Sequence, residues 1–352
     1  MSKIQIILGT MNIDYPFKSN KGNLSLEEEE EENKKIVHTY LSSSFQKEKE
    51  EKKEKKEKKV NIPILDTAYY YGKGKTHTSL SNILADFDEK TFPDAYFVAT
   101  KINPWYDNDF VHGKMGGLSR QNIEIQVETS LKDLHREKVD IMFLHAYDYE
   151  TPLEETLETM QQLWKKGKWT EWGLSNFSLS QCEDVLRICQ ENNYHPPSVY
   201  QGMYNILCRK VEELFPFLEK HDMRFWAYNP LCGGLLLGKT QKIGRFSNPI
   251  YQNIFWKEEI VKISQQLHQW ALKKGMETGG LELALLWLRD HSQLRPGKDA
   301  IILGASSLSQ FQQNWDILLS PPSSSSLTIT DNKEVEKKVS ILHPEVIPSY
   351  WY

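Results

Sequence analysis

Eight short runs rich in β-branched and aromatic residues recur along the chain, separated by stretches with a helical spacing of apolar residues. The predicted strands are residues 4–8, 61–65, 96–100, 139–144, 170–174, 198–200, 224–228 and 300–303. The clearest helical patterns cover residues 122–134, 153–165, 180–192, 211–220, 257–273 and 281–291. Strands that alternate with helices favour a parallel sheet with helices packed on it. We therefore expect one α/β domain over residues 1–352, a closed (β/α)8 TIM barrel, with an open doubly wound sheet as the alternative.

Local signals mark two of the helix ends. Ser180 and Glu183 have the spacing of a capping box at one helix start. Gly167 follows Lys165-Lys166 and indicates a helix stop.

Bulk composition excludes several classes of protein. The 352 residues include 39% hydrophobic residues, enough for a sizeable core, and the net charge of -5 argues against a nucleic-acid surface. No run approaches the roughly 20 apolar residues that cross a bilayer, and the apolar start is too short for a signal peptide. Four cysteines without paired C-x-x-C spacing are expected to be reduced thiols. We expect a cytoplasmic protein with no membrane and no nucleic-acid partner.

Two segments depart from the barrel pattern. Residues 27–32 are an acidic block and residues 47–59 are almost pure Glu and Lys, a composition of either a solvated helix or a disordered segment. Between them, residues 36–41 are apolar enough for the first barrel helix. We interpret residues 42–60 as a Glu/Lys-rich low-complexity insertion between that helix and the second strand, more simply a solvated extension than a partner-binding element. Residues 321–352 form a C-terminal tail whose aromatic end can fold back onto the body.

Reactive side chains stand at or just past the ends of three consecutive predicted strands. Asp66 and Tyr71 follow the second strand, Lys101 the third and His145 the fourth. Singly, each residue also has a structural explanation, such as a helix cap, an edge aromatic or a core histidine. In a parallel barrel, however, the carboxyl ends of the strands converge on one rim, where active sites are built. Their joint placement therefore favours a functional site.

These four groups make chemical sense as a proton donor and the groups that tune it. A phenol with an ordinary pKa of about 10 donates a proton poorly at neutral pH. A neighbouring ammonium favours the phenolate, a carboxylate keeps that ammonium charged, and an imidazole can orient a carbonyl oxygen. Such a site protonates an oxygen that becomes an alkoxide, so a hydride must come from a cofactor.

Ordered motifs at these strand ends resemble the aldo-keto reductase family. They are Leu8-Gly9-Thr10-Met11 and the segments 66–72, 99–101, 143–146, 173–177, 199–205 and 227–231. Further segments at 200–205, 233–239, 255–258, 291–294 and 302–314 resemble the aflatoxin-aldehyde/succinic-semialdehyde reductase subgroup. The resemblance implies NADPH-dependent reduction of aldehydes, and possibly ketones, in a barrel without a Gly-rich dinucleotide fold. It implies Tyr71 as proton donor, Lys101 and Asp66 as tuning residues, and His145 as the residue that orients a small-molecule carbonyl substrate.

The resemblance also implies a cofactor-binding set. Ser175, Asn176 and Gln201 would hold the nicotinamide amide, Asp66 would lie beside it, and Tyr228 would stack on the ring. The pyrophosphate and adenosine phosphate would lie against the loop after the seventh strand and the start of the last barrel helix. The residues expected there are Asn229, Leu231, Gly233, Leu235, Gly238, Lys239, Arg245, Ser306, Ser307, Gln310, Gln313 and Asn314. Arg245 is the candidate phosphate clamp because Arg binds phosphate bidentately, although a solvated loop arginine is the simpler structural explanation.

The chain departs from the family at two of these positions. Many relatives have an arginine where this chain has Gln310, which weakens the expected NADPH preference mildly. The subgroup's C-terminal arginine corresponds to Tyr352, which we take as a candidate substrate-binding residue and which argues against acidic aldehydes. The resemblance also allows a homodimer. The alternative function is a cofactor-binding regulatory subunit similar to potassium-channel β subunits.

One motif points to a different function and is rejected. Residues 233–240 fit the phosphate-loop pattern G-x-x-x-x-G-K-[ST]. That mechanism needs a strand leading directly into the loop and a helix that begins at the Lys. Residues 229–232 intervene here, and residues 241–246 lack helical periodicity.

Overall fold

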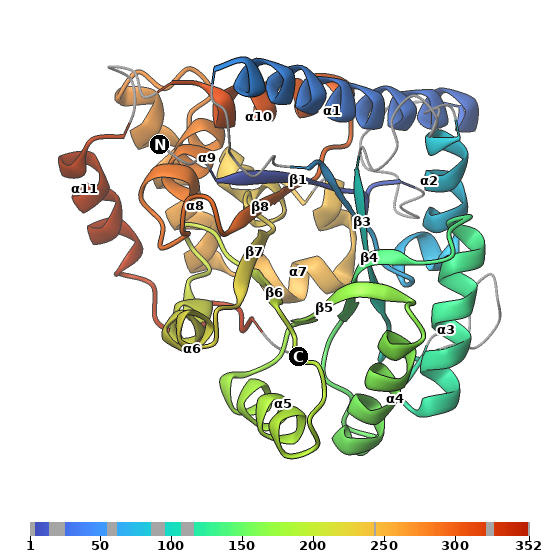
Figure 1. The fold of residues 1–352 in the computed structure, drawn as a ribbon. Helices are drawn as coiled ribbons and strands as arrows, with labels where there is room; N and C mark the ends of the chain where they lie inside the picture. The colour runs from blue at the N-terminus through green and yellow to red at the C-terminus, as the bar shows by residue number, and fades with distance from the viewer. Residues whose placement is uncertain are drawn as a thin grey trace.

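The chain folds as a closed barrel of eight parallel strands surrounded by helices (Figure 1). This computed structural model describes residues 4–13, 25–54, 62–85, 96–106, 116–242, 244–321 and 327–350. The strands neighbour one another in chain order, and β8 closes onto β1. Their bounds are β1 Gln5–Gly9, β2 Ile64–Asp66, β3 Phe97–Ile102, β4 Val139–Leu144, β5 Trp169–Ser175, β6 Val199–Met203, β7 Arg224–Tyr228 and β8 Ala300–Leu303. The expected TIM barrel is confirmed, and the open sheet is excluded.

The helices lie outside the barrel, and most of them connect successive strands. They are α1 Leu26–Glu54, α2 Thr76–Leu84, α3 Arg120–Asp133, α4 Leu153–Lys165, α5 Leu179–Glu191, α6 Phe215–Lys220, α7 Pro249–Phe255, α8 Glu258–Lys273, α9 Gly280–Asp290, α10 Leu308–Leu319 and α11 Ile329–Val339. Short 3₁₀ helices add η1 Tyr71–Gly74, η2 Lys210–Leu214, η3 Cys232–Leu237 and η4 Gly244–Ser247. The segment between β7 and β8 is the most elaborate connection, since it holds η3, η4 and α7 to α9.

Alternation along the strands divides the apolar residues between two cores. One set fills the barrel interior: Ile7, Ile64, Ala99, Ile141, Phe143, Val199, Trp226, Ala300 and Ile302. Neighbouring positions such as Leu8, Leu65 and Val98 point outward and pack under the helices. A strand reverses its side chains at every residue, so each strand contributes to both cores. The barrel is therefore a packed body whose rim is free to carry the polar residues.

Some of the predicted strand bounds and helix ends are confirmed, and one predicted helix cap is wrong. The fourth, seventh and eighth strands have the predicted bounds, and α4 ends before Gly167, whose backbone is left-handed with φ of 74°. The capping box predicted from Ser180 and Glu183 is wrong. The box is formed by Ser178 and Gln181, each of whose side chains accepts from the other's backbone N–H, so the helix begins one residue earlier.

Helix α1 runs through most of the charged segment. One continuous helix covers the acidic block, the apolar residues 36–41 and the Glu/Lys tract up to Glu54, in line with the helical alternative for that tract, and the insertion at residues 42–60 stays a prediction. Residues 55–61 lie outside the described residues. The anchor is the apolar centre: Tyr40 is fully buried, and its hydroxyl accepts from the Ile64 N–H of β2 and donates to the Ile6 carbonyl of β1. Glu and Lys are good helix formers, so the helix extends outward from that anchor.

The C-terminal tail contains a helix and returns to the barrel. Helix α11 begins at a capping box between Thr328 and Asp331. Beyond it, Tyr350 is buried and its hydroxyl donates to Glu213 of η2 at 2.6 Å. Tyr352 lies outside the described residues.

Candidate active site

Lys101 occupies the centre of the rim. Its ammonium donates to both carboxylate oxygens of Asp66 at 2.8 Å and to the carbonyl of Thr67 at 2.7 Å. Asp66 is the last residue of β2, and the register of β2, β3 and β4 brings Asp66 beside Ala99 and Lys101 beside Phe143. Both side chains are almost fully buried. The strand ends thus place an ion pair out of contact with solvent.

The phenol of Tyr71 lies on the open side of this ion pair. Its oxygen is 3.5 Å from the Lys101 ammonium, at the long limit of a hydrogen bond. Tyr71 begins η1, where Gly72 and Lys73 both have positive φ, so the chain turns sharply after it. Unlike Lys101, Tyr71 is only partly buried, which leaves its hydroxyl accessible from the rim.

His145 completes the group. It directly follows β4, and its ring meets the Tyr71 ring edge-on at 5.9 Å between centroids. Its Nδ1 is buried and has no hydrogen-bond partner within the described part of the chain. Burial, and then the charge of Lys101, lower the pKa of this imidazole well below its usual range. The neutral imidazole is therefore the relevant form at physiological pH, and it can act as a hydrogen-bond donor without a charge.

Burial also acts on the ion pair. It lowers the pKa of the Lys101 ammonium, and the Asp66 carboxylate opposes that shift. It raises the pKa of Asp66, opposed by Lys101 and by the amide of Gln201, which donates to Asp66 at 2.8 Å. We take the ionised pair as the ground state. Both carboxylate oxygens of Asp66 and the Thr67 carbonyl oxygen accept from the Lys101 ammonium, so each of its N–H groups has a short hydrogen bond that compensates for burial.

The residues expected around a nicotinamide form a second connected group beside the first. The Asn176 amide donates to the His145 carbonyl at 2.9 Å and to the Ser175 hydroxyl at 3.1 Å. The Tyr228 hydroxyl donates to the Asn176 carbonyl oxygen at 2.7 Å. Asn176 has φ of 59°, a left-handed conformation that Asn tolerates better than most residues. Ser175, Asn176, Gln201 and Tyr228 therefore converge on the rim as predicted, and their roles there remain predictions.

The sequence did not identify Trp105 as part of this rim. Its ring packs edge-on against His145 at 4.9 Å and against Tyr70 at 5.5 Å. Asn103 holds its backbone from both sides, and the amide of Gln126 in turn holds Asn103. A tryptophan after a predicted strand end is the signal that could have revealed it. With Tyr70, it forms an aromatic wall beside the phenol and the imidazole.

The loop after β7 is built around tight backbone turns. Asn229 has φ of 59°, and its side-chain oxygen accepts from the Gly233 N–H at 2.6 Å. Leu235 is fully buried, so only its backbone can face a ligand. Residues 232–237 form η3, and no helix begins at Lys239, since the next α-helix, α7, starts at Pro249. The phosphate-loop interpretation is therefore excluded by the fold.

Lys239 and Arg245 place two cations near this loop. The Arg245 guanidinium donates to the Asn12 side-chain oxygen at 2.9 Å, and the Asn12 amide donates to the Ala305 carbonyl at 2.8 Å. Burial lowers the pKa of Lys239, and the neighbouring positive charge of Arg245 lowers it further. Within the described residues neither cation is recorded in an ion pair. The two neighbouring positive charges repel each other. An anionic ligand such as a phosphate would relieve this repulsion by binding to both.

The start of α10 carries the remaining predicted cofactor residues. Ser307 caps the helix, accepting from the Gln310 N–H, and the Gln310 side chain bonds to Ser306. Asn314 is buried on the next turn, and Gln313 is exposed. This helix start lies three residues beyond Ala305, which bonds to Asn12.

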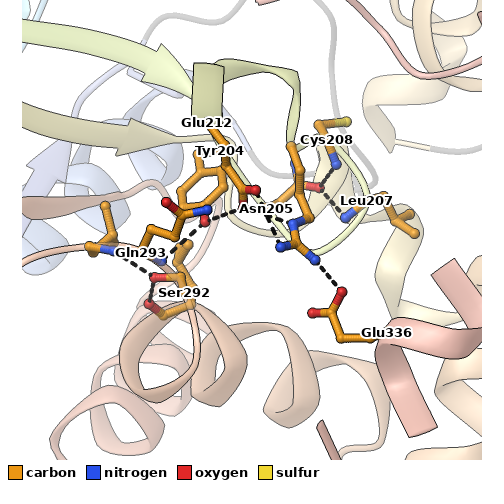
Figure 2. Close-up of polar contacts among 11 residues, drawn as sticks. Tyr204, Asn205, Leu207, Cys208, Glu212, Ser292, Gln293 and Glu336 are labelled. Atoms are coloured by element: carbon orange, nitrogen blue, oxygen red, sulfur yellow. Dashed lines mark hydrogen bonds and ion pairs between the residues drawn. The ribbon is translucent and has the colours of Figure 1, made fainter. Parts of the chain in front are cut away.

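The loop after β6 is braced from two sides, as Figure 2 shows. The Asn205 side chain accepts from the Leu207 and Cys208 N–H groups (Figure 2). It also donates to the Asn229 carbonyl at 3.0 Å. Arg209 bonds both to Glu212 in the same loop and to Glu336 of α11. The C-terminal helix thereby contacts the loop that supports the backbone of Asn229. Asn205 is a further supporting residue that the sequence did not single out.

Two other features are absent from the part of the chain that the structure describes. Within the described residues, no group of three or more His, Cys, Asp or Glu side chains is placed to hold a metal ion. No helix in the described ranges is both long and apolar enough to cross a membrane.

A closed barrel with an acid, a phenol, an ammonium and an imidazole at one rim is the architecture of a (β/α)8-barrel enzyme. The family model described as the Aldo/keto reductase family matches residues 5–334. The chain belongs to this family, and it is accordingly an oxidoreductase whose family fits carbonyl reduction with a nicotinamide cofactor.

Several individual proteins are similar to this chain. Human aflatoxin B1 aldehyde reductase member 4 is 39% identical over 273 residues, which cover 71% of this chain and 77% of the relative. Human aflatoxin B1 aldehyde reductase member 2 is 40% identical over 270 residues, 71% of either chain. The solved glycerol dehydrogenase of Gluconobacter oxydans shares the fold, with a TM-score of 0.68, 22% identity and coverage of 96% of this chain and 94% of that one. The resemblance to the aflatoxin-aldehyde reductase subgroup is thus confirmed.

Proposed function

We propose that this protein reduces aldehydes to alcohols with NADPH, and that Tyr71 donates the proton. The observation that carries the proposal is the Lys101 ammonium, bound by Asp66 and reaching the Tyr71 oxygen at 3.5 Å. The relatives named as aflatoxin B1 aldehyde reductases support an aldehyde as the substrate class. Ketones are a secondary expectation of the same chemistry.

The proposed step adds two electrons and two hydrogens to the carbonyl group. A bound nicotinamide would supply the hydride to the carbonyl carbon. Tyr71 gives its proton to the carbonyl oxygen, and Lys101 stabilises the phenolate that remains. His145, neutral because it is buried, orients the oxygen by a hydrogen bond without competing as an acid. Asp66 keeps the ammonium charged, so removing any one of these groups weakens the same proton transfer.

The chain's residues fit the proposed cofactor. Ser175, Asn176, Gln201 and Tyr228 surround the position expected for the nicotinamide, close to Asp66 and His145. The two cations Lys239 and Arg245 suit a pyrophosphate. The turns at 229–238 and the first turns of α10 supply backbone N–H groups. These positions are the cofactor-binding residues that we propose, as predicted from the sequence.

For the substrate end we propose an aromatic pocket. Trp105 and Tyr70 stand beside the phenol and the imidazole. Tyr352, which corresponds in the sequence to the subgroup's C-terminal arginine, is proposed as a substrate-binding residue. Apolar and aromatic aldehydes should therefore be better substrates than acidic ones such as succinic semialdehyde. We also propose a cytoplasmic location, which suits four free buried cysteines, and a homodimer like the subgroup.

The test is turnover by purified protein. Loss of the reduced-nicotinamide absorbance with a small aromatic aldehyde, and its disappearance in Tyr71→Phe, would support the proposal. NADH measured in parallel tests the cofactor, and succinic semialdehyde tests the pocket. Tight cofactor binding with no turnover on a broad carbonyl panel would instead point to the regulatory-subunit function.

A further inference from the structure

A carboxylate from the first helix touches the start of the last barrel helix. The Leu308 backbone N–H, in the first turn of α10, donates to the Glu32 carboxylate of α1 at 2.7 Å. The two residues are 276 positions apart, so the contact exists only because α1 and α10 pack side by side across the top of the barrel (Figure 1). Glu32 is the last residue of the acidic block, whose composition indicated either a solvated helix or a disordered segment.

The surroundings of this contact belong to the proposed adenosine end of the cofactor site. Ala305, three residues before Leu308, accepts from Asn12, and Asn12 accepts from Arg245. A small pocket lies between α1 and the loop after β8, and its lining includes Asn12, Ala305 and Asn33, the neighbour of Glu32. Glu32 therefore brings a negative charge to the border of the region where we propose that phosphate binds.

The donor that Glu32 pairs is not the one that the helix cap uses. The Ser307 side chain accepts from the Gln310 N–H, and the Gln310 side chain bonds to Ser306, whereas Glu32 accepts from the Leu308 N–H. What Glu32 adds is charge: it occupies an N–H donor at a positive helix terminus that also attracts phosphate. Gln310 in the same turn carries no positive charge that would offset it.

We propose that Glu32 is a specificity-determining residue that weakens binding of the 2′-phosphate of NADPH relative to the 2′-hydroxyl of NADH. The inference rests on the proposed cofactor function and deepens it. A 2′-phosphate at the α10 terminus must compete with Glu32 for the same donor and is repelled by its charge. A 2′-hydroxyl is neutral and can accept or donate beside the carboxylate. Glu32 thereby reduces the preference for NADPH over NADH.

The test measures binding and needs no turnover. Isothermal titration at low salt gives Kd for adenosine 2′,5′-bisphosphate and for adenosine 5′-monophosphate, with the full chain as wild type, Glu32→Gln and Glu30→Gln. Gln keeps an oxygen that can accept from Leu308, so Glu32→Gln removes the charge and retains the hydrogen bond. Glu30→Gln removes the same charge from an exposed position on the same helix.

In Glu32→Gln, the ratio of the bisphosphate affinity to the monophosphate affinity should rise about fivefold to tenfold, as expected for one like-charge contact at a partly exposed site. In Glu30→Gln that ratio should stay within about twofold of wild type, because separated surface charges are screened. An unchanged ratio in Glu32→Gln, or an equal rise in both variants, would overturn the proposal. Failure of both nucleotides to bind any variant would overturn the cofactor site and this inference together. Normal nucleotide binding without reductase turnover would overturn only the proposed reaction.

Discussion

The phenol oxygen of Tyr71 lies 3.5 Å from the ammonium of Lys101, and that ammonium donates to Asp66 but not to solvent. Proton donation from Tyr71 therefore depends on a positive charge that is shielded from solvent. Tyr71→Phe should reduce kcat/KM for an aromatic aldehyde by about 10²- to 10⁴-fold, the usual contribution of a general acid. Cofactor affinity, measured by quenching of tryptophan fluorescence, should stay near wild type.

The matched control is Tyr70→Phe, a change at the neighbouring tyrosine, whose ring packs edge-on against Trp105 instead. Its kcat/KM should change by less than about tenfold. Equal losses in the two variants would mean that the wrong tyrosine has been assigned.

Breaking the buried ion pair should affect stability as well as turnover. Lys101→Met leaves the Asp66 carboxylate buried, with the Gln201 amide as its side-chain donor among the described residues. This variant should reduce the free energy of unfolding by about 3–5 kcal/mol. The double variant Lys101→Met/Asp66→Asn removes the stranded charge and should recover a large part of that loss in urea unfolding. Both variants should lack reductase turnover. A double variant less stable than the single one would contradict the ionised pair.

His145 should make stability depend on pH. Its pKa in the folded protein lies well below its usual range because of burial and Lys101, whereas the unfolded chain binds the proton below about pH 6.5. The unfolded state therefore gains protons first, so the contribution of this residue is present above about pH 6.5 and is lost as the pH falls further. His145→Gln should flatten the fall in unfolding free energy between about pH 7 and pH 5. The exposed His343→Gln serves as control and should leave the slope as in wild type.

The bridge from Arg209 to Glu336 should stabilise the C-terminal helix. Arg209 binds Glu212 and Glu336 at once and is less than one-third exposed, a two-sided contact that a lysine cannot reproduce. Arg209→Lys should lower the unfolding free energy by about 1 kcal/mol and speed proteolytic cleavage near α11. Arg187→Lys, in a solvent-exposed set of pairs on α5, should leave both the unfolding free energy and the cleavage rate as in wild type. A matching loss in the two variants would show that the bridge does not hold α11.

The rim residues were predictable because a parallel barrel brings strand ends together. Apolar runs that stop at Lys101 and His145 indicated both the strand and the side on which the reactive group emerges. Ser175 and Tyr228 were expected from the family resemblance, and both are the final residues of their strands, β5 and β7.

Contacts across the fold were not predictable in this way. Glu32 reaches Leu308, and Asn205 reaches Asn229, through packing between elements that no periodicity relates. The length of helix α1 was not predictable for another reason: its charged ends are helical but have no apolar period that would indicate a helix. The capping residue is Ser178 and not Ser180. Both serines have a hydroxyl that can cap a helix, and the sequence does not show which of them has the extended backbone of an N-cap, as Ser178 does.

Closure of β8 onto β1 has a consequence for how this protein is made. The seam pairs Gln5 with Ala300 and Leu8 with Leu303, and Asn12 bonds to Ala305, 293 positions away. During synthesis β1 cannot pair with β8 until β8 has been made. The sheet therefore keeps an unpaired edge until nearly the whole chain has left the ribosome. A nucleotide held by Arg245 and α10 would lie across this same seam. It would then act as a late folding ligand, and newly made chains should mature faster and aggregate less when the cofactor is abundant.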